Sequence, residues 1–346
     1  MSATPWLSKG RLAVLGSGQA FPGSPVTTGD LIALMRDRFG FARTREATAI
    51  AGRLGIASRH VCRDFGARLE TARRDESNSA LAARAVSAAL AQAGLRPGDL
   101  AYLIGHTTTP DQPLPANIAM VADRIGYEGP HVELRQACTG FANALMIAFG
   151  LVAAGSGPVA IVGSETGSLF LDPADLDADA DQIVNMVQMG DGAGAIIVGA
   201  DAPGHSSIEA AWFGALGKGR APGISRQHGQ PRFDHDFAAI RAEGHRLFDA
   251  GRDAAAMQGF PLEAARHVVP HQVSGRIGLL AAAHFALPPE RVFVQADRIG
   301  NTGSAAIWIA LDTLRSTAAP GDGIVVLGAE ASKHMYGGFA YRQADG

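Results

Sequence analysis

RQACTGFANAL, residues 135–145, places a cysteine among some of the smallest side chains of the sequence. Cys138 is followed by Thr139 and Gly140, and the apolar spacing beyond them predicts a helix that begins at this turn. A thiol at the start of a helix lies near free backbone N–H groups and the positive end of the helix dipole. Both favour the thiolate, so the pattern indicates a nucleophile. A buried, unreactive cysteine is the alternative on this segment alone.

Short apolar segments alternate with helix-like segments along most of the chain. Strands are predicted over 11–22, 131–137, 158–168, 291–300 and 322–333, and a strand followed by a loop over 99–110 and over 264–275. Helices are predicted over 76–95, 116–126, 139–155, 274–287 and 304–318. Ser77 or Asn78 is expected to cap the first of these helices, and Gly94 to end it. This alternation indicates an α/β fold with largely parallel strand pairing.

The two halves of the sequence resemble each other. Residues 132–168 can be aligned with residues 292–333: in both, a strand enters a Gly-bearing turn, a helix follows, and the next strand ends in Gly-Ser/Ala-Glu-Thr/Ala. This pattern predicts an internal duplication, with one half at residues 1–180 and the other at 181–346. The turn that holds the cysteine and the turn that holds Asn301 are equivalent points, and we expect the packed halves to bring them together.

The composition narrows the class of protein. With 346 residues, 47% of them hydrophobic, the chain can bury a large core. A formal net charge of -3 argues against nucleic acid or an anionic membrane as the main partner. Two cysteines cannot form a disulfide framework, no cluster suggests a metal, and no signal peptide is evident, so a cytoplasmic protein is expected. Cys62 is interpreted as structural, and the irregular stretch 217–236 as an exposed loop.

Two polar residues of the second half are candidates for chemistry. His271 follows an apolar strand in PHQVSGRI (270–277), at the kind of strand end where α/β folds bind ligands. Asn301 opens the strand-to-helix turn GNTGSAA (300–306), 30 residues later (301 − 271). Each has a plainer interpretation: a hydrogen-bonded structural histidine, for which His106 is the closest rival, and a helix-cap asparagine.

Cys138, His271 and Asn301, in this order, resemble the reactive residues of the thiolase-fold condensing enzymes, and within them of β-ketoacyl-[acyl carrier protein] synthase III. The likeness covers almost the whole chain. Four further segments are similar to family motifs: RLGIASRH (53–60), TTTPDQPLPAN (107–117), GDGAGAIIVG (190–199) and, loosely, IRAEGHRLFDAG (240–251). The resemblance implies an α/β, thiolase-like fold, in which two duplicated βα halves form a five-layered α-β-α-β-α architecture.

The resemblance also implies a role for each residue. Cys138 would take an acyl group from acyl-CoA or acyl carrier protein, forming an S-acyl enzyme. His271 and Asn301 would hold the thioester carbonyl of a malonyl extender, which becomes an anionic enolate when carbon dioxide leaves. The backbone N–H groups of Cys138 and Ala331 would form the oxyanion hole for the condensation. The implied enzyme is an acyltransferase of fatty-acid initiation or of specialised lipid or polyketide biosynthesis, without cofactor or metal.

The sequence departs from the family pattern in three places. GAEASKHMYGGF (328–339) replaces a run of glycines that follows a phenylalanine. Ala49 stands four positions before Arg53, where the family has an aromatic residue that stacks on the CoA adenine. Leu114 replaces a bulky aromatic residue before Pro115, at the end of the acyl pocket. These differences predict a primer larger than acetyl, carried on CoA or on a carrier protein.

Further residues are implied to bind the substrate and its carrier. Arg276 corresponds to a family arginine that contacts the phosphopantetheine phosphate or the acidic carrier protein, and Arg53 and Ser274 are also candidates for substrate or carrier binding. The family is normally dimeric, with the segment 107–117 at the interface, so a homodimer is expected.

Two alternatives remain open on the sequence. One is an acyltransferase of the same fold that moves the acyl group of Cys138 to an alcohol or amine without decarboxylation. Asn301 argues against it, because a donor that stabilises an enolate would then have little purpose. The other is a non-catalytic partner subunit of a heteromeric ketosynthase, against which the intact Cys138, His271 and Asn301 argue.

Overall fold

The computed structural model describes residues 4–65, 76–226 and 232–345. Within these residues, one sheet has the strand order β12-β13-β14-β9-β2-β8-β7-β5-β6, with β1 beside β9. Its strands are β1 (Trp6–Leu7), β2 (Leu12–Ala20), β5 (Tyr102–His106), β6 (His131–Leu134), β7 (Val159–Glu165), β8 (Gly192–Ala200), β9 (Ser206–Ala215), β12 (His267–Pro270), β13 (Gly323–Glu330) and β14 (Met335–Arg342). Outside this sheet, β3 (Val26–Thr27) pairs antiparallel with β4 (Ser58–Arg59), and β10 (Ile224–Ser225) pairs with β11 (Asp234–His235) as a hairpin.

The helices have the following bounds. The α-helices are α1 (Thr28–Phe39), α2 (Thr44–Leu54), α3 (Asn78–Ala93), α4 (Asn117–Ile125), α5 (Gly140–Ala153), α6 (Ala180–Gln188), α7 (Phe237–Met257), α8 (Ile277–Phe285), α9 (Ala296–Ile299) and α10 (Ala306–Arg315). Short 3-10 turns occur at Pro97–Asp99, Gly167–Phe170, Pro173–Asp175, Leu262–Ala264, Pro289–Arg291 and Gly303–Ala305.

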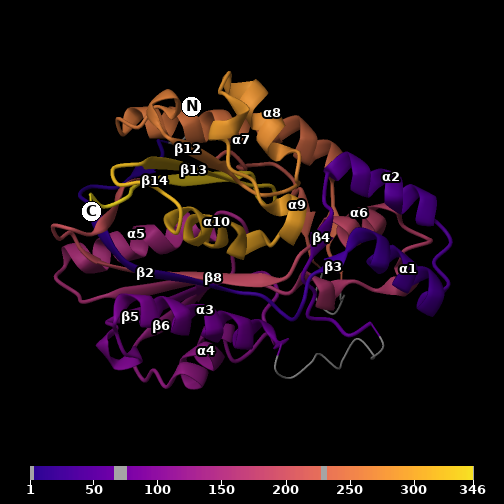
Figure 1. The fold of residues 1–346 in the computed structure, drawn as a ribbon, viewed down its shortest axis with the longest axis horizontal. Helices are drawn as coiled ribbons and strands as arrows, with labels where there is room; N and C mark the ends of the chain where they lie inside the picture. The colour runs from indigo at the N-terminus through magenta and orange to yellow at the C-terminus, as the bar shows by residue number, and fades with distance from the viewer. Residues whose placement is uncertain (1–3, 66–75, 227–231, 346) are drawn as a thin grey trace.

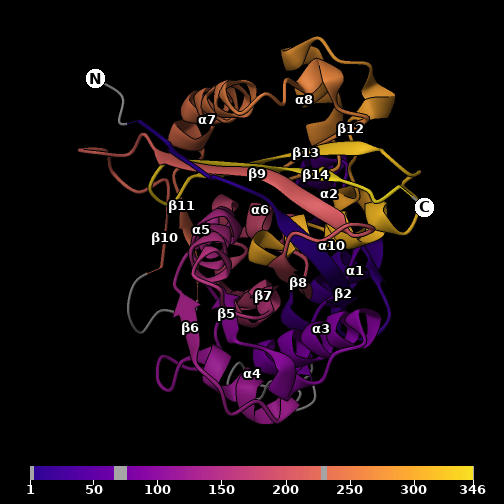
Figure 2. The same ribbon diagram turned by 90° about the vertical axis from the view of Figure 1, so that its left-hand side faces the viewer.

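The elements stack in five layers (Figures 1 and 2). Helices α7 and α8 cover one face of the β12-β13-β14 region, and α3 and α4 cover the far face of the β2-β8-β7-β5 region. Helices α5 and α10 lie between the two sheet regions. The α-β-α-β-α architecture predicted from the sequence is therefore confirmed. Strand β8 follows the predicted boundary at 180/181 and pairs with β7 and β2, which precede it; the boundary itself stays a prediction.

The strand pairing is mixed, and the prediction of largely parallel pairing is wrong. Parallel pairs are confined to β5 with β6 and β7, and to β12 with β13. Strands β2, β8, β9 and β14 are antiparallel to the neighbours with which they pair. The βαβ units of the sequence form the parallel pairs. The antiparallel pairs have connections of different kinds: a short turn joins β13 to β14, whereas α6 lies between β7 and β8.

Most predicted elements are present, with one clear exception. Helix α3 begins and ends as expected: the Ser77 hydroxyl accepts from the N–H of Ala80, and Gly94 takes a left-handed conformation with φ 66°. The strand predicted over 291–300 is wrong. This segment forms a single bridge, between Val268 and Val292, and then turns into α9. The polar run after Val294 carries no further alternation that a strand would need.

The predicted loop 217–236 lies partly outside the described residues, at 227–231. Its described parts form the hairpin of β10 and β11, and they are not simply exposed. Ile224, Arg226 and Phe233 line a cavity described below, and the imidazole of His235 stacks on the ring of Phe237 with 4.9 Å between ring centroids. The prediction of an exposed loop is therefore wrong for these residues.

The middle layer fixes the starts of α5 and α10 with respect to each other. Phe141, in the first turn of α5, meets the ring of Trp308 of α10 edge-on, with 6.0 Å between centroids. Phe339 of β14 stacks on Trp308 at 5.7 Å and meets Phe141 at 5.8 Å. All three side chains are almost fully buried. Because such a cluster tolerates little displacement, it holds the turns before both helices in place.

Close contact between β2 and α3 requires glycine at residue 16. A Cβ atom there would lie 2.3 Å from the carbonyl oxygen of Ala89. Gly150, on the exposed side of α5, has nothing within 4 Å of the equivalent position. Backbone atoms cannot yield as a flexible side chain can, so the two glycines should respond to alanine in opposite directions.

We expect Gly16→Ala to lower the free energy of unfolding by about 1–3 kcal/mol, because the added methyl group forces α3 away from β2. Gly150→Ala is the matched control, and should raise it by up to about 1 kcal/mol through the better helix propensity of alanine. Urea unfolding followed by circular dichroism measures both. Equal stability of the two variants would contradict the packing described.

Candidate active site

Cys138 lies in the turn between β6 and α5, where the sequence analysis placed it. Thr139 is the N-cap residue, and α5 begins at Gly140. A Cβ atom on Gly140 would lie 2.7 Å from the Nδ1 atom of His106, so only glycine lets the helix start so close to β5. The small residues around Cys138 thus permit a sharp turn pressed against the sheet.

A buried carboxylate from the other half of the chain holds this turn. Glu330, the last residue of β13, accepts hydrogen bonds from the backbone N–H of Thr139 at 2.9 Å and from its hydroxyl at 2.7 Å. The hydroxyl of Ser332 donates to the other carboxylate oxygen. Glu330 is one of the residues by which the chain departs from the glycine-rich family loop, and here it fixes the residue next to Cys138.

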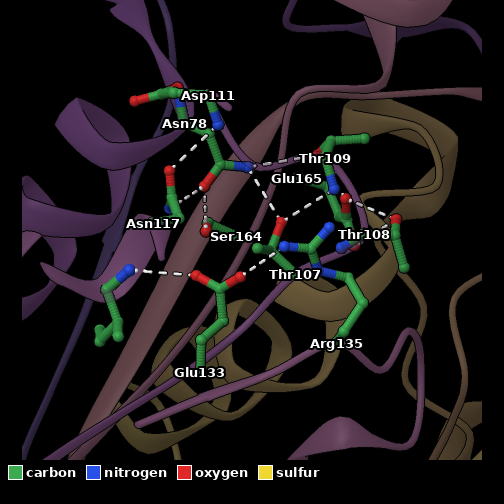
Figure 3. Close-up of polar contacts among 11 residues, drawn as sticks. Asn78, Thr107, Thr108, Thr109, Asp111, Asn117, Glu133, Arg135, Ser164 and Glu165 are labelled. Atoms are coloured by element: carbon green, nitrogen blue, oxygen red, sulfur yellow. Dashed lines mark hydrogen bonds and ion pairs between the residues drawn. The ribbon is translucent and has the colours of Figure 1, made fainter. Parts of the chain in front are cut away.

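The equivalent carboxylate of the first half holds the turn that follows Asn301. Glu165, the last residue of β7, accepts from the hydroxyl of Ser304 at 2.5 Å. The backbone N–H and the hydroxyl of Thr108 and the hydroxyl of Thr109 also donate to it, as Figure 3 shows. Glu165 and Glu330 end the strands that the duplication aligns. The carboxylate of each half therefore holds a turn of the other half: Glu330 holds the Cys138 turn, and Glu165 holds the turn after Asn301.

Asn301 is oriented by its neighbours. Its backbone N–H donates to the carbonyl of Gln188 at 2.8 Å, and its carbonyl accepts from the N–H of Gly190 at 3.0 Å. The side-chain oxygen accepts from the N–H of Gly303 at 3.0 Å. With the oxygen held in this way, the amide NH₂ group is left as a donor. The GDGAGA turn, which starts at Gly190, therefore serves to support Asn301.

His271 follows β12 and is 2% exposed. Its backbone N–H donates to the carbonyl of Leu327 at 2.8 Å. Burial lowers the pKa of His271 to about 4, so the imidazole is neutral at pH 7. A neutral imidazole can donate one hydrogen bond, and it avoids the charge that would disfavour burial.

The structure brings the three predicted residues to one cavity. Cys138, His271 and Asn301 line a cavity of about 510 Å³ between α7, α8 and the sheet, and Ala331 lines it as well. A second cavity, of about 360 Å³, also reaches Cys138 and Asn301, and lies toward Glu165, Phe170 and the β10-β11 hairpin. Two cavities therefore meet at the sulfur. We call them the α7–α8 cavity and the hairpin cavity.

The charge environment of Cys138 is the reverse of the one expected from the helix start. Burial raises the pKa of its thiol well above the ordinary value, and the charges of Glu330 and Glu165 raise it further. A hydrogen bond from the backbone acts in the opposite direction but is the smallest contribution. Burial and the two carboxylates thus outweigh the backbone of the turn, and the net environment favours the thiol over the thiolate.

Other predicted binding residues do not line either cavity. Leu114 is 85% exposed in the single chain; its place at the end of the acyl pocket stays a prediction. Arg276 caps α8 and donates from its guanidinium to the carbonyl of Gly52 at 3.3 Å, beside the exposed Arg53. Ser274 is buried and its carbonyl accepts from the N–H of Ile277. Arg276 nevertheless lies between Val273 and Ile277, which do line the α7–α8 cavity.

His106 and Cys62 have structural surroundings. The Nε2 atom of His106 accepts from the indole N–H of Trp308 at 2.9 Å, and burial lowers the pKa of this histidine to about 3. Cys62 is fully buried, and its backbone N–H donates to Asp191 at 2.6 Å. The rival histidine therefore supports α10, and Cys62 is buried away from both cavities, as the sequence analysis assumed.

The sequence analysis missed Glu165 and Arg226 as residues of the site, and it identified Glu330 only as a departure from the family loop that would change the pocket or its support. The repeat had a signal for the two glutamates, because both end the Gly-Ser/Ala-Glu segments that the halves share. Arg226 had no such signal, because it lies in the irregular stretch 217–236, which was predicted to be an exposed loop. Its position in the hairpin cavity depends on long-range packing that no local pattern encodes.

Replacing Glu330 should make Cys138 more reactive. In Glu330→Gln the amide oxygen can still accept from Thr139 while the charge is gone, so the pKa of the thiol should fall and iodoacetamide should alkylate it several-fold to about tenfold faster at pH 7. In the wild type, the rate should climb about tenfold per pH unit through neutral pH, because only the thiolate reacts. Cys138→Ser controls for labelling of Cys62. An unchanged rate in Glu330→Gln would contradict the charge effect.

The described residues give no sign of a metal site or of a membrane span. No group of three or more His, Cys, Asp or Glu side chains in this part of the chain could hold a metal ion. Nor does any helix in 4–65, 76–226 or 232–345 combine the length and apolar character that crossing a bilayer requires.

Comparison with known proteins agrees with this fold and site. The family model of 3-oxoacyl-[acyl-carrier-protein] synthase III matches residues 132–217, and the model of its C-terminal part matches 256–338. The β-ketoacyl-[acyl-carrier-protein] synthase III of Rhizorhabdus wittichii is 31% identical, over 96% of this chain and 98% of its own. The 3-oxopimeloyl-[acyl-carrier-protein] synthase of Rhodothermus marinus is 31% identical, over 90% and 88%.

Solved structures lead to the same family. AbyA1, a tetronic acid condensing enzyme, superimposes with a TM-score of 0.83 at 25% identity, over 97% of this chain and all of its own. The synthase III of Pseudomonas aeruginosa PAO1 gives a TM-score of 0.77 at 27% identity, over 96% and 98%. With identities above 30% over nearly the full length of the relatives and the same fold throughout, this chain belongs to the β-ketoacyl-[acyl carrier protein] synthase III family of thiolase-fold condensing enzymes.

Proposed function

We propose that this protein catalyses the decarboxylative Claisen condensation of an acyl thioester with malonyl-[acyl carrier protein], through an S-acyl intermediate on Cys138. The observation that carries the proposal is that Cys138, His271 and Asn301, from three distant parts of the chain, line one cavity. The pathway would be fatty-acid initiation or specialised lipid or polyketide biosynthesis. The acyl donor would be carried on CoA or on the phosphopantetheine of the carrier protein, with no further cofactor.

The first step is acylation. The sulfur of Cys138 attacks the thioester carbonyl, the bond from this carbon to the donor sulfur breaks, and the thiol proton passes to the leaving thiol. The oxyanion formed on the way would be held by the backbone N–H groups of Cys138 and Ala331, both of which line the α7–α8 cavity. Since Ala331 offers a backbone donor, the loss of the glycine run does not remove this function.

The second step needs donors that are neutral. Loss of carbon dioxide from the malonyl group leaves an enolate, and its carbanion attacks the acyl carbonyl on Cys138. The bond from this carbon to the sulfur of Cys138 then breaks, and the released thiolate takes a proton from solvent to restore the thiol. His271, neutral because its pKa is lowered to about 4, and the amide NH₂ of Asn301 can both donate to the enolate oxygen. Preorganised donors of this kind stabilise the developing charge without reorganisation. The bond to the departing carboxylate breaks as its electron pair enters the enolate.

The proposal also covers the size of the primer, the docking of the carrier protein and the oligomeric state. The two cavities, of about 510 and 360 Å³, leave room for more than an acetyl group beside the thioester arm, which supports a primer larger than acetyl. The carrier protein would dock where Arg276 lies, beside Val273 and Ile277 of the α7–α8 cavity. A homodimer is part of the proposal, on the strength of the family resemblance.

Removing one donor should separate the two steps. We expect His271→Ala and Asn301→Ala each to lower carbon dioxide release from malonyl carrier protein on the order of a hundredfold or more. Acylation of Cys138 by acyl-CoA, followed by intact-protein mass spectrometry, should continue in both variants. Acyl transfer to an alcohol or amine with no carbon dioxide released would instead favour the non-decarboxylating acyltransferase. A wild type that gains no acyl mass would favour a non-catalytic subunit.

Primer size can be tested with the wild-type protein alone. Medium-chain acyl-CoA thioesters should acylate Cys138 with a higher kcat/KM than acetyl-CoA, because a longer chain fills apolar cavity surface that acetyl leaves wet. Stopped-time mass spectrometry across a series of chain lengths gives the comparison. Acetyl-CoA performing as well as the longer thioesters would refute the primer prediction and leave the condensation proposal standing.

A further inference from the structure

The hairpin cavity contains a cation, Arg226, to which the described residues (4–65, 76–226 and 232–345) give no ion-paired or hydrogen-bonded partner. Arg226, half-buried beside β10, lines this cavity together with Cys138. Its guanidinium lies over the ring of Phe170, 4.5 Å from the centroid. Among the residues that the structure describes, it makes no hydrogen bond and no ion pair. A partly buried cation without a counter-ion is unfavourable, and an incoming anion would relieve this.

The other charged groups of the cavity already have partners. Arg135 donates to the carboxylate of Glu133 at 2.8 Å (Figure 3). Glu165 accepts from Thr108, Thr109 and Ser304, and Glu330 accepts from Thr139 and Ser332. Both carboxylates are thus committed to holding the turns of the site. Arg226 is the charged group of this cavity that is left to meet a ligand.

The surroundings of Arg226 change its pKa in the direction expected of a partly buried cation that lacks a paired anion. Burial lowers the pKa of Arg226 most, and the neighbouring cation Arg135 lowers it further, while the carboxylate of Glu165 acts in the opposite direction. Burial also raises the pKa of Glu165, although its hydrogen bonds from Ser304, Thr108 and Thr109 act in the opposite direction. A guanidinium remains protonated in such surroundings, and its planar pair of donors fits a carboxylate.

We propose that the hairpin cavity binds an acyl group whose far end carries a carboxylate, and that Arg226 pairs with it while the thioester end reaches Cys138. This rests on the proposed function, because it names the class of primer for the same acylation step. The substrate is then a mono-thioester of a dicarboxylic acid. The thioester bond exchanges from the donor sulfur to the sulfur of Cys138, the thiol proton goes to the leaving thiol, and the distal carboxylate is unchanged.

The acylation half-reaction tests this without the extender. Three pairs of CoA thioesters match a carboxylate with a neutral group of the same shape: succinyl with 4-methylpentanoyl, glutaryl with 5-methylhexanoyl, and adipoyl with 6-methylheptanoyl. Because malonyl is absent, any preference belongs to the primer and not to the carboxylate that is later lost. In the wild type, at least one dicarboxylic thioester should acylate Cys138 with a kcat/KM about tenfold or more above its neutral match.

Two variants locate the preference. Arg226→Met keeps the length of the apolar stem and removes the charge, so it should abolish the preference by lowering kcat/KM for the dicarboxylic thioester about tenfold or more, with little change for the neutral match. Arg241→Met makes the same change in the α7–α8 cavity, which Arg241 lines, and should keep the preference. Arg226→Lys should restore part of it, since an ammonium cannot bind both oxygens as a guanidinium does.

Several outcomes would overturn the proposal. Neutral thioesters that acylate Cys138 as well as, or better than, their dicarboxylic matches would refute it, while carbon dioxide release would show that the condensation proposal survives. A preference that disappears in Arg241→Met but not in Arg226→Met would place the carboxylate in the other cavity. If no thioester of either kind acylates Cys138, both this inference and the proposed function fail together.

Discussion

Two buried carboxylates, exchanged between the halves of the chain, hold the site together. Glu330 ends a strand of the second half and accepts a hydrogen bond from Thr139, the residue next to Cys138. Glu165 ends the equivalent strand of the first half and accepts a hydrogen bond from Ser304, in the turn that follows Asn301. Leaving the Thr139 N–H without its acceptor would cost about 1–3 kcal/mol, and more where a charged partner is lost. The duplication explains the reciprocity, because equivalent strand ends meet equivalent helix starts across the middle layer.

The two carboxylates fix the positions of the turns, but they also oppose ionisation of the Cys138 thiol. The same carboxylates that fix the turns raise the pKa of Cys138, so little thiolate is present before a substrate arrives. His271 is kept neutral by burial, which suits a donor to an anionic oxygen but not an ion-pair partner for the sulfur. In the proposed mechanism, the acylation step must therefore move the proton of Cys138 as the substrate's thiol leaves.

The sequence predicted what local pattern and duplication encode. The cap at Ser77, the end of α3 at Gly94 and the turns at Cys138 and Asn301 all follow from residue types that have one favoured use. The meeting of the two turns followed from the repeat. The segment 291–300, by contrast, is apolar enough to suggest a strand, but makes only one bridge. The position of Arg226 in the hairpin cavity was not predicted, because the path of a loop depends on distant packing rather than on its own composition.

The pairing of β2 has a consequence for how the protein is made. This strand is synthesised before both of its partners, β8 and β9, and β8 begins at Gly192, 180 residues after Leu12 (192 − 12). Closing such a long loop is entropically unfavourable, and non-local strand pairing is slow. The nascent N-terminal strand must therefore wait, with both edges open, until more than half of the chain has been synthesised. Its protection from aggregation during that interval rests on α3, whose close contact through Gly16 and Gly18 can cover one face early.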